Sequence, residues 1–380
     1  MSSRAGRIAA GAAILALTGV FAVTTAGPAG PALDRARPSG PTKCITDAPQ
    51  GPSGSWIFPE LRALRTRVWV SALSWVQVAS RRPTDPTAPD DPAYAWPNSI
   101  DLAVKQARAR GIEPVLLVNG FPAWSNGGRD STWVPSNPAD YGAFMAAAVR
   151  RYPAVRRWIA FGEPSHYVNF QPQGGNGQRA PRLYAQLLDA AYRAMHAVRR
   201  DVVVIGGNVH PSGLNNEYST APDTFLRYMV LPNGRRPRMD MFGINPFTER
   251  DLDMKLPHQA GRVDFNDLDW LTRQLDRYYP GRRLQLFIEE FGWNTEHIAS
   301  GWWYVVSRKK QAARLTRAFQ IAARFPRINT MCWFQLYDSP PFREGGRWQN
   351  WTSGLRTSGG ARKPSWTAFA RVPPGPRRLR

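Results

Sequence analysis

Short apolar runs alternate along this chain with longer stretches of helical periodicity. Seven runs rich in Val, Ile, Leu, Phe and Trp predict buried strands, at residues 67–73, 113–119, 157–161, 202–206, 239–245, 284–289 and 330–336. Between these runs, apolar residues recur at helical spacing and predict amphipathic helices, at residues 99–110, 141–151, 182–199, 268–278 and 309–324. Strands that alternate with helices in this way are typical of βαβ units with parallel strands.

The number of strands favours closure into a barrel. A weaker apolar run at 43–46, followed by a helical pattern at 58–65, supplies an eighth strand. We therefore predict an α/β fold of the (β/α)8 TIM-barrel type as one domain over residues 43–372, a length that such a barrel needs. A doubly wound open sheet is the alternative, although no glycine-rich phosphate loop follows an early strand, so a nucleotide site has no support.

The first residues have the pattern of a secretory signal. Arg4 and Arg7 precede an apolar stretch at 8–23, and small residues follow it, which predicts a signal peptide at 1–26. An uncleaved membrane anchor is the alternative, and glycines interrupt the apolar stretch. Residues 27–42 are rich in Pro, Gly and Ala and predict a linker. The mature protein is expected to be secreted, with attachment to the cell wall as one option.

The chain is strongly basic. It has 50 Lys and Arg against 28 Asp and Glu, a net charge of +22, and it ends in a basic tail at 373–380. An exported protein of this charge is expected to meet an anion such as an acidic polysaccharide or a phosphate-bearing wall polymer. The alternative is a compositional origin, because nearly all the basic residues are Arg, as in proteins from GC-rich genomes. No specific nucleic-acid partner is predicted.

Two predicted strands each lead directly into a carboxylate. The segment at 158–164 contains Glu163 and the segment at 286–293 contains Glu290. Parallel strands of a barrel bring their carboxyl ends to one face, so both side chains are expected in one pocket. A pair of carboxyl groups that flank one glycosidic bond is what a glycosidase needs, one protonated and one ionised.

The motifs around these glutamates are similar to those of a known family. The chain resembles the clan A retaining glycoside hydrolases, most closely family 39-like and family 5-like barrels, from about residue 44 to residue 369. The matching motifs are Gly162-Glu163-Pro164 on the fourth strand, Glu289-Glu290-Phe291-Gly292-Trp293 on the seventh, Phe121-Pro122-Ala123-Trp124, Trp333, and Lys363-Pro364. The resemblance implies a carbohydrate substrate. We predict no metal and no other cofactor, because no spacing of His, Cys or carboxylate residues suits a metal site.

The resemblance also assigns catalytic roles. It implies that Glu163 is the general acid and base and Glu290 the nucleophile, with carboxyl groups about 5–5.5 Å apart, as retention of configuration requires. Side chains alternate along a strand, so Glu289 and Glu290 are expected to point to opposite sides. Glu290 is preferred because the family nucleophile immediately precedes Phe-Gly. No residue spacing resembles a zinc or EF-hand site.

Two departures from the family pattern concern substrate contacts. Gly162 replaces the family Asn that binds the sugar 2-hydroxyl, and Asn245-Pro246-Phe247 replaces His-Pro-Tyr after the sixth strand. Asn208 and His210, just after the fifth strand, are candidates to replace the lost polar groups, with an ordinary loop histidine as the alternative for His210. The residues expected to contact the sugar are Trp124, Asn208, His210, Asn245, Trp293 and Trp333. For each Trp, packing of a long loop against the barrel is the alternative.

The only two cysteines are Cys44 and Cys332, on the first and eighth predicted strands. These strands become neighbours when a barrel closes, so an exported protein could join them in a disulfide; two buried thiols are the alternative. Three functions stay open: a secreted retaining O-glycoside hydrolase, a non-catalytic glycan-binding barrel, and a basic wall-binding surface protein. The sequence is silent on the sugar, the linkage, endo or exo action, and the oligomeric state.

Overall fold

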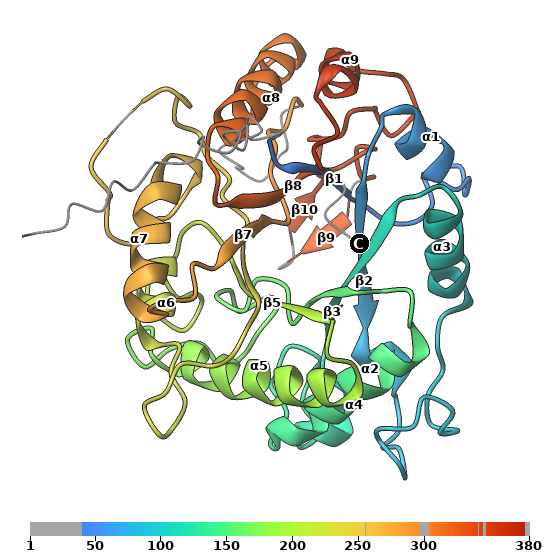
Figure 1. The fold of residues 1–380 in the computed structure, drawn as a ribbon, viewed down its shortest axis with the longest axis vertical. Helices are drawn as coiled ribbons and strands as arrows, with labels where there is room; N and C mark the ends of the chain where they lie inside the picture. The colour runs from blue at the N-terminus through green and yellow to red at the C-terminus, as the bar shows by residue number, and fades with distance from the viewer. Residues whose placement is uncertain (1–39, 255, 297–303, 341, 345–346, 377–380) are drawn as a thin grey trace, which may run out of the picture. The chain divides into compact units, whose positions relative to one another are not determined.

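The computed structural model describes residues 40–254, 256–296, 304–340, 342–344 and 347–376. Eight parallel strands form a closed barrel in chain order, and β1 pairs with both β2 and β8. Helices surround the strands (Figure 1). The predicted (β/α)8 fold is therefore confirmed. The strands are Thr42–Thr46 (β1), Val68–Ser74 (β2), Glu113–Asn119 (β3), Arg157–Ile159 (β4), Val203–Val209 (β5), Met241–Ile244 (β6), Gln285–Ile288 (β7) and Ile328–Phe334 (β8).

The helices follow the strands, as the apolar periodicity predicts. They are Phe58–Ala63 (α1), Trp75–Val78 (α2), Asn98–Ala109 (α3), Pro138–Arg151 (α4), Arg179–Val198 (α5), Pro222–Tyr228 (α6), Leu268–Tyr278 (α7), Arg308–Ala323 (α8) and Pro364–Arg371 (α9), with short 3-10 helices at Ala123–Ser125 (η1) and Phe265–Asp267 (η2). A small antiparallel ribbon, Phe342–Glu344 (β9) and Arg347–Gln349 (β10), follows β8. The sequence pattern did not predict α6, because seven residues are too few to show a helical period. No described helix has the length and apolar composition of a bilayer-spanning helix.

Alternating side chains divide the core into two layers. One set fills the barrel interior, and the other packs between the strands and the helices. On β2, for example, Val68 and Val70 face inward and Trp69 packs outside the barrel. The interior set is Cys44, Val68, Val70, Val115, Leu117, Ile159, Ile205, Met241, Phe287 and Cys332.

The two cysteines face each other across neighbouring strands of this interior. Cys44 and Cys332 are register partners of β1 and β8, and the structure joins them in a disulfide. The disulfide hypothesis is thus confirmed. It links the first strand of the barrel to the last, at the seam where the sheet closes.

Two strands, β4 and β8, end two residues earlier than the apolar pattern predicts. β8 stops at Phe334, because the backbone N–H groups of Leu336 and Tyr337 donate to the Asp47 carboxylate, at 2.9 and 3.2 Å, instead of to a strand. β4 stops at Ile159, and the chain turns toward Glu163. Where a strand ends early, the residues that follow it place polar groups at the mouth of the barrel.

The predicted end segments fall only partly within the described residues. The predicted signal peptide at 1–26 lies outside them, as does the linker up to residue 39. Thr42, the last predicted linker residue, already begins β1. Near the basic tail, the Pro374 carbonyl accepts a hydrogen bond from the Lys43 N–H, and the Pro376 carbonyl accepts one from the Thr42 hydroxyl.

Candidate active site

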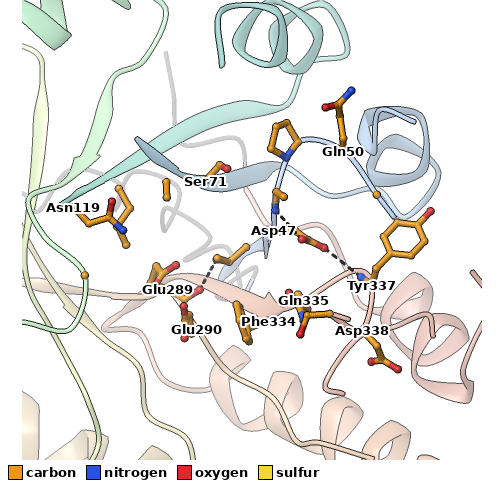
Figure 2. Close-up of a pocket in the computed structure, with 18 of the residues that line it drawn as sticks. Asp47, Gln50, Ser71, Asn119, Glu289, Glu290, Phe334, Gln335, Tyr337 and Asp338 are labelled. Atoms are coloured by element: carbon orange, nitrogen blue, oxygen red, sulfur yellow. Dashed lines mark hydrogen bonds between the residues drawn. The ribbon is translucent and has the colours of Figure 1, made fainter. Parts of the chain in front are cut away.

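A cavity of about 670 Å³ opens at the carboxyl ends of the barrel strands. Seven of the eight strands contribute to its lining, either with residues near their carboxyl ends or with the segments that follow them, and most of the lining residues are polar (Figure 2). Its polar lining residues are Thr46, Asp47, Gln50, Ser71, Ser99, Asn119, Glu163, Asn169, Asn245, Glu289, Glu290, Gln335, Tyr337, Asp338 and Ser339. Figure 2 shows Glu289 and Glu290 next to each other, on the opposite side of the view from Gln50 and Tyr337.

Glu163 enters the cavity from an unusual backbone position. Its φ is +44°, a left-handed conformation that residues other than glycine adopt uncommonly. Its N–H donates to the Asn208 carbonyl at 3.0 Å, and its carboxylate Oε1 accepts a hydrogen bond from the Asn245 amide at 3.0 Å. Such backbone conformations cluster at functional sites, where the surrounding contacts hold them. The structure therefore fixes Glu163 from both its backbone and its side chain.

Glu289 is the more buried of the two adjacent glutamates. It continues the inward-facing alternation of Phe287 and is 1% exposed. Its Oε2 accepts a hydrogen bond from the Asn208 amide at 3.4 Å, and its backbone carbonyl accepts one from the Thr46 hydroxyl at 2.6 Å. Burial raises the pKa of Glu289 to about 7, and the charge of Glu163 contributes to the increase, while the hydrogen bond from Asn208 opposes it.

Glu290 is half-buried and its side chain lines the cavity. Its backbone N–H donates to the Asn245 Oδ1 at 3.1 Å. Burial raises the pKa of Glu290 well above its usual range, and the charges of Glu289 and Glu163 raise it further. Carboxyl groups that share one cavity repel one another when they ionise, which is why the neighbouring charges raise the pKa of Glu290 in the same direction as burial does.

Two buried asparagines connect the strands that carry the glutamates. Asn245, after β6, bonds both the Glu163 side chain and the Glu290 backbone. Asn208 lies at a register shift between β5 and β6 and has a positive φ of 52°. A bulge of this kind redirects a side chain, here toward Glu289. Gly243 leaves room for it, because a Cβ there would lie 3.0 Å from the Asn208 Oδ1.

The two histidines near the fourth and fifth strands stand beside Glu163 but do not line the cavity. Their rings, His166 and His210, are 5.8 Å apart, and the His210 Nδ1 lies 3.0 Å from the Ser212 carbonyl. Burial lowers the pKa of His166 to about 4, and His210 lowers it further, against the opposing effect of Glu163. The sequence prediction singled out His210 and missed His166, which lies three residues after Glu163.

The three predicted sugar-binding tryptophans lie away from the cavity lining. Trp293 and Trp333 are 1% and 0% exposed, and their indole N–H groups donate to the Thr248 and Ser353 carbonyls. Trp124 packs edge-on against Trp75 and donates to the Ala79 carbonyl. At these positions the three indole rings pack loops against the outside of the barrel. The geometry therefore does not support the sugar contact expected of them.

Both departures from the family pattern have a structural counterpart. At Gly162 a Cβ would lie 3.1 Å from the Leu117 side chain, so Leu117 occupies the space that a larger residue would need. At Phe247 the ring packs 6.0 Å from the ring of Tyr304, which comes from the loop after β7. Burial raises the pKa of Tyr304 to about 12, with contributions from neighbouring charges that include Glu163. The phenol ring of Tyr304 thus lies beside Phe247.

Several lining residues were not predicted. Asp47, Asn119 and Gln335 follow β1, end β3 and follow β8, respectively. The usable signal was a polar residue at the carboxyl end of each apolar run, which the sequence analysis applied only to some strands. Among the described residues, no three His, Cys, Asp or Glu side chains lie in positions suited to one metal ion.

Comparisons with known proteins support the fold. No family model matches the chain. No curated protein matches it in sequence either. Solved structures do match, among them a family 39 glycoside hydrolase from Bacteroides cellulosilyticus WH2, with 18% identity, a TM-score of 0.62, and coverage of 89% of this chain and 64% of that one.

Two further structures give the same result. A glucosidase from Croceicoccus marinus has 17% identity and a TM-score of 0.60, with coverage of 88% of this chain and 67% of that one. A family 39 β-xylosidase from Caulobacter crescentus has 19% identity and a TM-score of 0.58, with coverage of 88% and 72%. The chain thus spans about two thirds of the length of these proteins and shares their barrel fold.

Proposed function

We propose that this chain is a retaining O-glycoside hydrolase that cleaves an oligosaccharide or polysaccharide. The observation that carries the proposal is the convergence of Glu163, from the end of β4, with Glu289 and Glu290, from the end of β7, in one cavity at the barrel mouth. A pair of carboxyl groups at this face is the arrangement that glycoside hydrolysis requires. The glycosidases that share the fold support the same reaction class.

In the proposed mechanism Glu163 is the acid and base, and Glu290 is the nucleophile. The protonated Glu163 gives its proton to the glycosidic oxygen while the ionised Glu290 attacks the anomeric carbon, so the C–O bond breaks and a glycosyl ester forms. Glu163 then takes a proton from water, which attacks the same carbon and releases the sugar from Glu290. The hydrogen bonds of Asn245 to Glu163 and to the Glu290 backbone hold the pair together.

Glu290 is preferred over Glu289 as the nucleophile because of access. Glu289 is 1% exposed and bonded to Asn208, whereas Glu290 is half-buried in the cavity. A nucleophile must reach the anomeric carbon at bonding distance. Glu289 is then a buried neighbour of the nucleophile. When Glu289 is ionised, its charge raises the pKa of Glu290.

The lining of the cavity favours a neutral sugar at the cleavage position. Among its described lining residues are Asp47, Glu163, Glu289, Glu290 and Asp338, and none is Lys, Arg or His. A carboxylate on the substrate would find no basic partner among these lining residues, and any of the five carboxyl groups that is ionised would repel it. We therefore place any anionic part of the substrate, which the basic composition suggested, outside this cavity.

A non-catalytic glycan-binding barrel is the second candidate. The observation that favours it is Gly162, which has no side chain to present to the sugar where the resembling glycosidases have an Asn, and whose Cβ position lies 3.1 Å from the Leu117 side chain. Such a protein would bind the same sugars without turning them over.

The test is hydrolysis of a panel of neutral and acidic aryl glycosides and polysaccharides by the purified protein. Glu163→Gln and Glu290→Gln are compared with Glu217→Gln, which removes an exposed carboxylate outside the cavity. Turnover by the wild type and by Glu217→Gln, but by neither of the other two variants, supports the proposal. Saturable binding of a sugar without turnover by the wild type would establish the glycan-binding barrel instead.

Two further features belong to the proposal. Retention is checked by nuclear magnetic resonance of the first anomer released, which has the configuration of the substrate in a retaining enzyme. Secretion, inferred from residues 1–26, is checked by N-terminal sequencing of protein from the culture medium, which is expected to begin near residue 27.

A further inference from the structure

The cavity that contains the three glutamates extends beyond them. Its further lining comes from three segments of the chain: residues 47–52 after β1, residues 99–100 in the first turn of α3, and residues 337–340 after β8. We call this part of the cavity the extension. Figure 2 shows Gln50 and Tyr337, from two of these segments, on the opposite side of the view from Glu289. The proposed bond cleavage at the glutamates does not by itself use the extension.

The extension lies on the side of the barrel opposite the proposed acid. Glu163 follows β4, and most of the extension lies at the ends of β1 and β8, which pair with each other. In a closed barrel of eight strands in chain order, β4 and β8 are four strands apart and face each other across the axis. In the proposed mechanism Glu163 protonates the oxygen of the leaving group, so the leaving group lies on the β4 side. The sugar that is attacked, and any sugar joined to its other end, therefore lies toward the extension.

Hydrogen bonds hold the walls of the extension in place. The Asp47 carboxylate, whose contacts with backbone N–H groups tie the segment after β8 to the end of β1, also accepts a hydrogen bond from the Ala48 N–H at 2.7 Å. The Tyr337 hydroxyl donates to the Glu60 Oε2 at 3.1 Å. The ring of Tyr337 lies against Gly51, where a Cβ would be 2.9 Å from it. Walls that are already fixed lose little conformational entropy when a ligand binds.

The surface of the extension suits an uncharged sugar. The two carboxylates among its described residues already have partners: Asp47 accepts the hydrogen bonds above, and Asp338 pairs with the buried Lys363, whose Nζ lies 2.6 Å from it. Other polar groups remain available, because the Ser99 hydroxyl and the Gln50 Oε1 have no hydrogen-bond partner among the described residues. Apolar surface comes from three prolines, Pro49, Pro52 and Pro340. The hydroxyl groups of a sugar need polar partners, and its C–H faces pack against apolar surface.

We propose that the extension binds a second neutral sugar of the glycone, the part of the substrate that Glu290 attacks. The protein then acts on chains and releases products of two or more sugars instead of single terminal sugars. The whole cavity, of about 670 Å³, is within the range of about 300–1,000 Å³ that holds drug-sized ligands, which are larger than a single sugar. This inference rests on the proposed hydrolysis, because the positions of Glu163 and Glu290 define which side of the bond the extension serves.

The experiment compares aryl glycosides that differ only in the length of the glycone. The probes are two pairs, 4-nitrophenyl β-glucoside with 4-nitrophenyl β-cellobioside, and 4-nitrophenyl β-xyloside with 4-nitrophenyl β-xylobioside. The leaving group is the same within each pair, so the ratio of kcat/KM, two-sugar over one-sugar, measures binding of the second sugar in the transition state. We expect a ratio of about ten or more for at least one pair, which a few hydrogen bonds and apolar contacts with the second sugar supply.

Two substitutions in the extension are measured in the same way. Ala48→Trp adds a ring at an exposed position of the lining and fills the extension, so the ratio should fall to about one. Gln50→Ala removes an exposed amide group without adding volume and should lower the ratio in the same direction, which keeps the test valid if Ala48→Trp does not fold. Ala154→Trp is the matched control, because it adds the same ring at an exposed position before β4, outside the cavity. It should keep the ratio of the wild type.

The outcomes distinguish failure of the inference from failure of the proposed hydrolysis. A ratio near one in both pairs, with turnover of the one-sugar glycosides, would overturn the inference and leave the hydrolysis intact. An unchanged ratio in both Ala48→Trp and Gln50→Ala would also overturn the inference.

If no probe is turned over, the proposed hydrolysis fails for these sugars, and calorimetric titration with cellobiose and xylobiose decides the inference. Saturable binding of either disaccharide that weakens in Ala48→Trp, and not in Ala154→Trp, would support a second sugar site in the extension of a glycan-binding barrel. Absence of such binding would overturn it.

Discussion

The two ends of the barrel carry opposite charge on the same eight strands. At the carboxyl ends, Glu163, Glu289 and Glu290 share a cavity whose described lining has no basic residue. At the amino ends, four arginines line a cavity with one glutamate, Glu113. Carboxylates occur at both ends, yet the partners of these glutamates differ: amide groups donate to Glu163 and Glu289 at the mouth, and a guanidinium donates to Glu113.

This difference distinguishes a carboxylate that stabilises the fold from carboxylates suited to take part in a reaction. The Glu113 charge is matched by Arg157 through two short hydrogen bonds, so the ion pair is a structural element. The side chains of Glu163 and Glu289 have amide partners that carry no charge. Burial raises the pKa of Glu289 to about 7 and that of Glu290 well above its usual range. Clustered carboxyl groups with displaced pKa values in a cavity are typical of catalytic sites. The following predictions test this contrast.

The largest effect is expected from removal of the proposed nucleophile. Glu290→Ala should lower kcat by about 10³-fold or more, because no covalent intermediate forms without the carboxylate. Sodium azide, a small anionic nucleophile, should restore part of the activity by entering the vacated space. Glu289→Ala is the matched variant, and azide is expected to give it no recovery. Activity is measured by the release of an aryl leaving group. If azide restored activity to Glu289→Ala and not to Glu290→Ala, Glu289 would be the nucleophile and Glu290 its neighbour.

At the other end of the barrel, Glu113→Gln should act on stability. The substitution leaves Arg157 buried without its counter-ion, and breaking a buried ion pair costs about 3–5 kcal/mol. The free energy of unfolding is measured by urea denaturation, while kcat of the folded protein should stay unchanged. Glu217→Gln, at an exposed position, should leave the free energy of unfolding within about 0.5 kcal/mol of the wild type. A large loss of kcat in folded Glu113→Gln would contradict the assignment of stability to the amino end of the barrel and of catalysis to the carboxyl end.

An intermediate effect is expected from Asn245→Ala. This substitution removes the hydrogen bond to the Glu163 carboxylate and the one to the Glu290 backbone, so the two groups lose their common support. We expect kcat to fall by about 10–100-fold, since a displaced catalytic group costs that much in rate. Asn329→Ala, a matched change at the amino end, should leave kcat unchanged. Equal kinetic losses in both variants would indicate a general loss of structure.

The smallest effect concerns the pH dependence of stability. The folded-state pKa of Glu289 is about 7, above its usual value near 4.5, so the native state holds this proton more tightly than the unfolded state. The contribution of Glu289 to the stability of the folded state is fully present below about pH 4.5 and is lost as the pH rises through 7. Glu289→Gln cannot ionise and should therefore gain stability relative to the wild type between pH 5 and pH 8, by about 1 kcal/mol or more.

The comparison of melting temperatures at these two pH values checks this prediction. The difference in Tm between Glu289→Gln and the wild type should be larger in favour of the variant at pH 8. Glu217→Gln serves as the control, because an exposed carboxylate ionises alike in the folded and unfolded chain. A constant difference across the range would mean that Glu289 titrates at its ordinary pKa.

The sequence by itself determined the barrel and most of the strand and helix positions. The spacing of apolar residues along the chain is a local property, so the runs at 113–119 and 268–278 have the bounds that β3 and α7 have in the structure. It also brought Glu163 and Glu290 to one face, since parallel strands share a direction. The Cys44 and Cys332 pair followed from the neighbourhood of the first and last strands.

Only the tertiary structure decided which side chains fill the space between these elements. The aromatic rings of Trp124, Trp293 and Trp333 pack loops against the barrel and do not line the cavity. Burial of an aromatic ring is favourable in either position, so the sequence alone does not distinguish between them. The bulge that turns Asn208 toward Glu289, and the cavity that arginines from three separate segments form, depend on backbone register and on contacts between distant residues. Local patterns carry no information about such distances, which arise when the barrel closes.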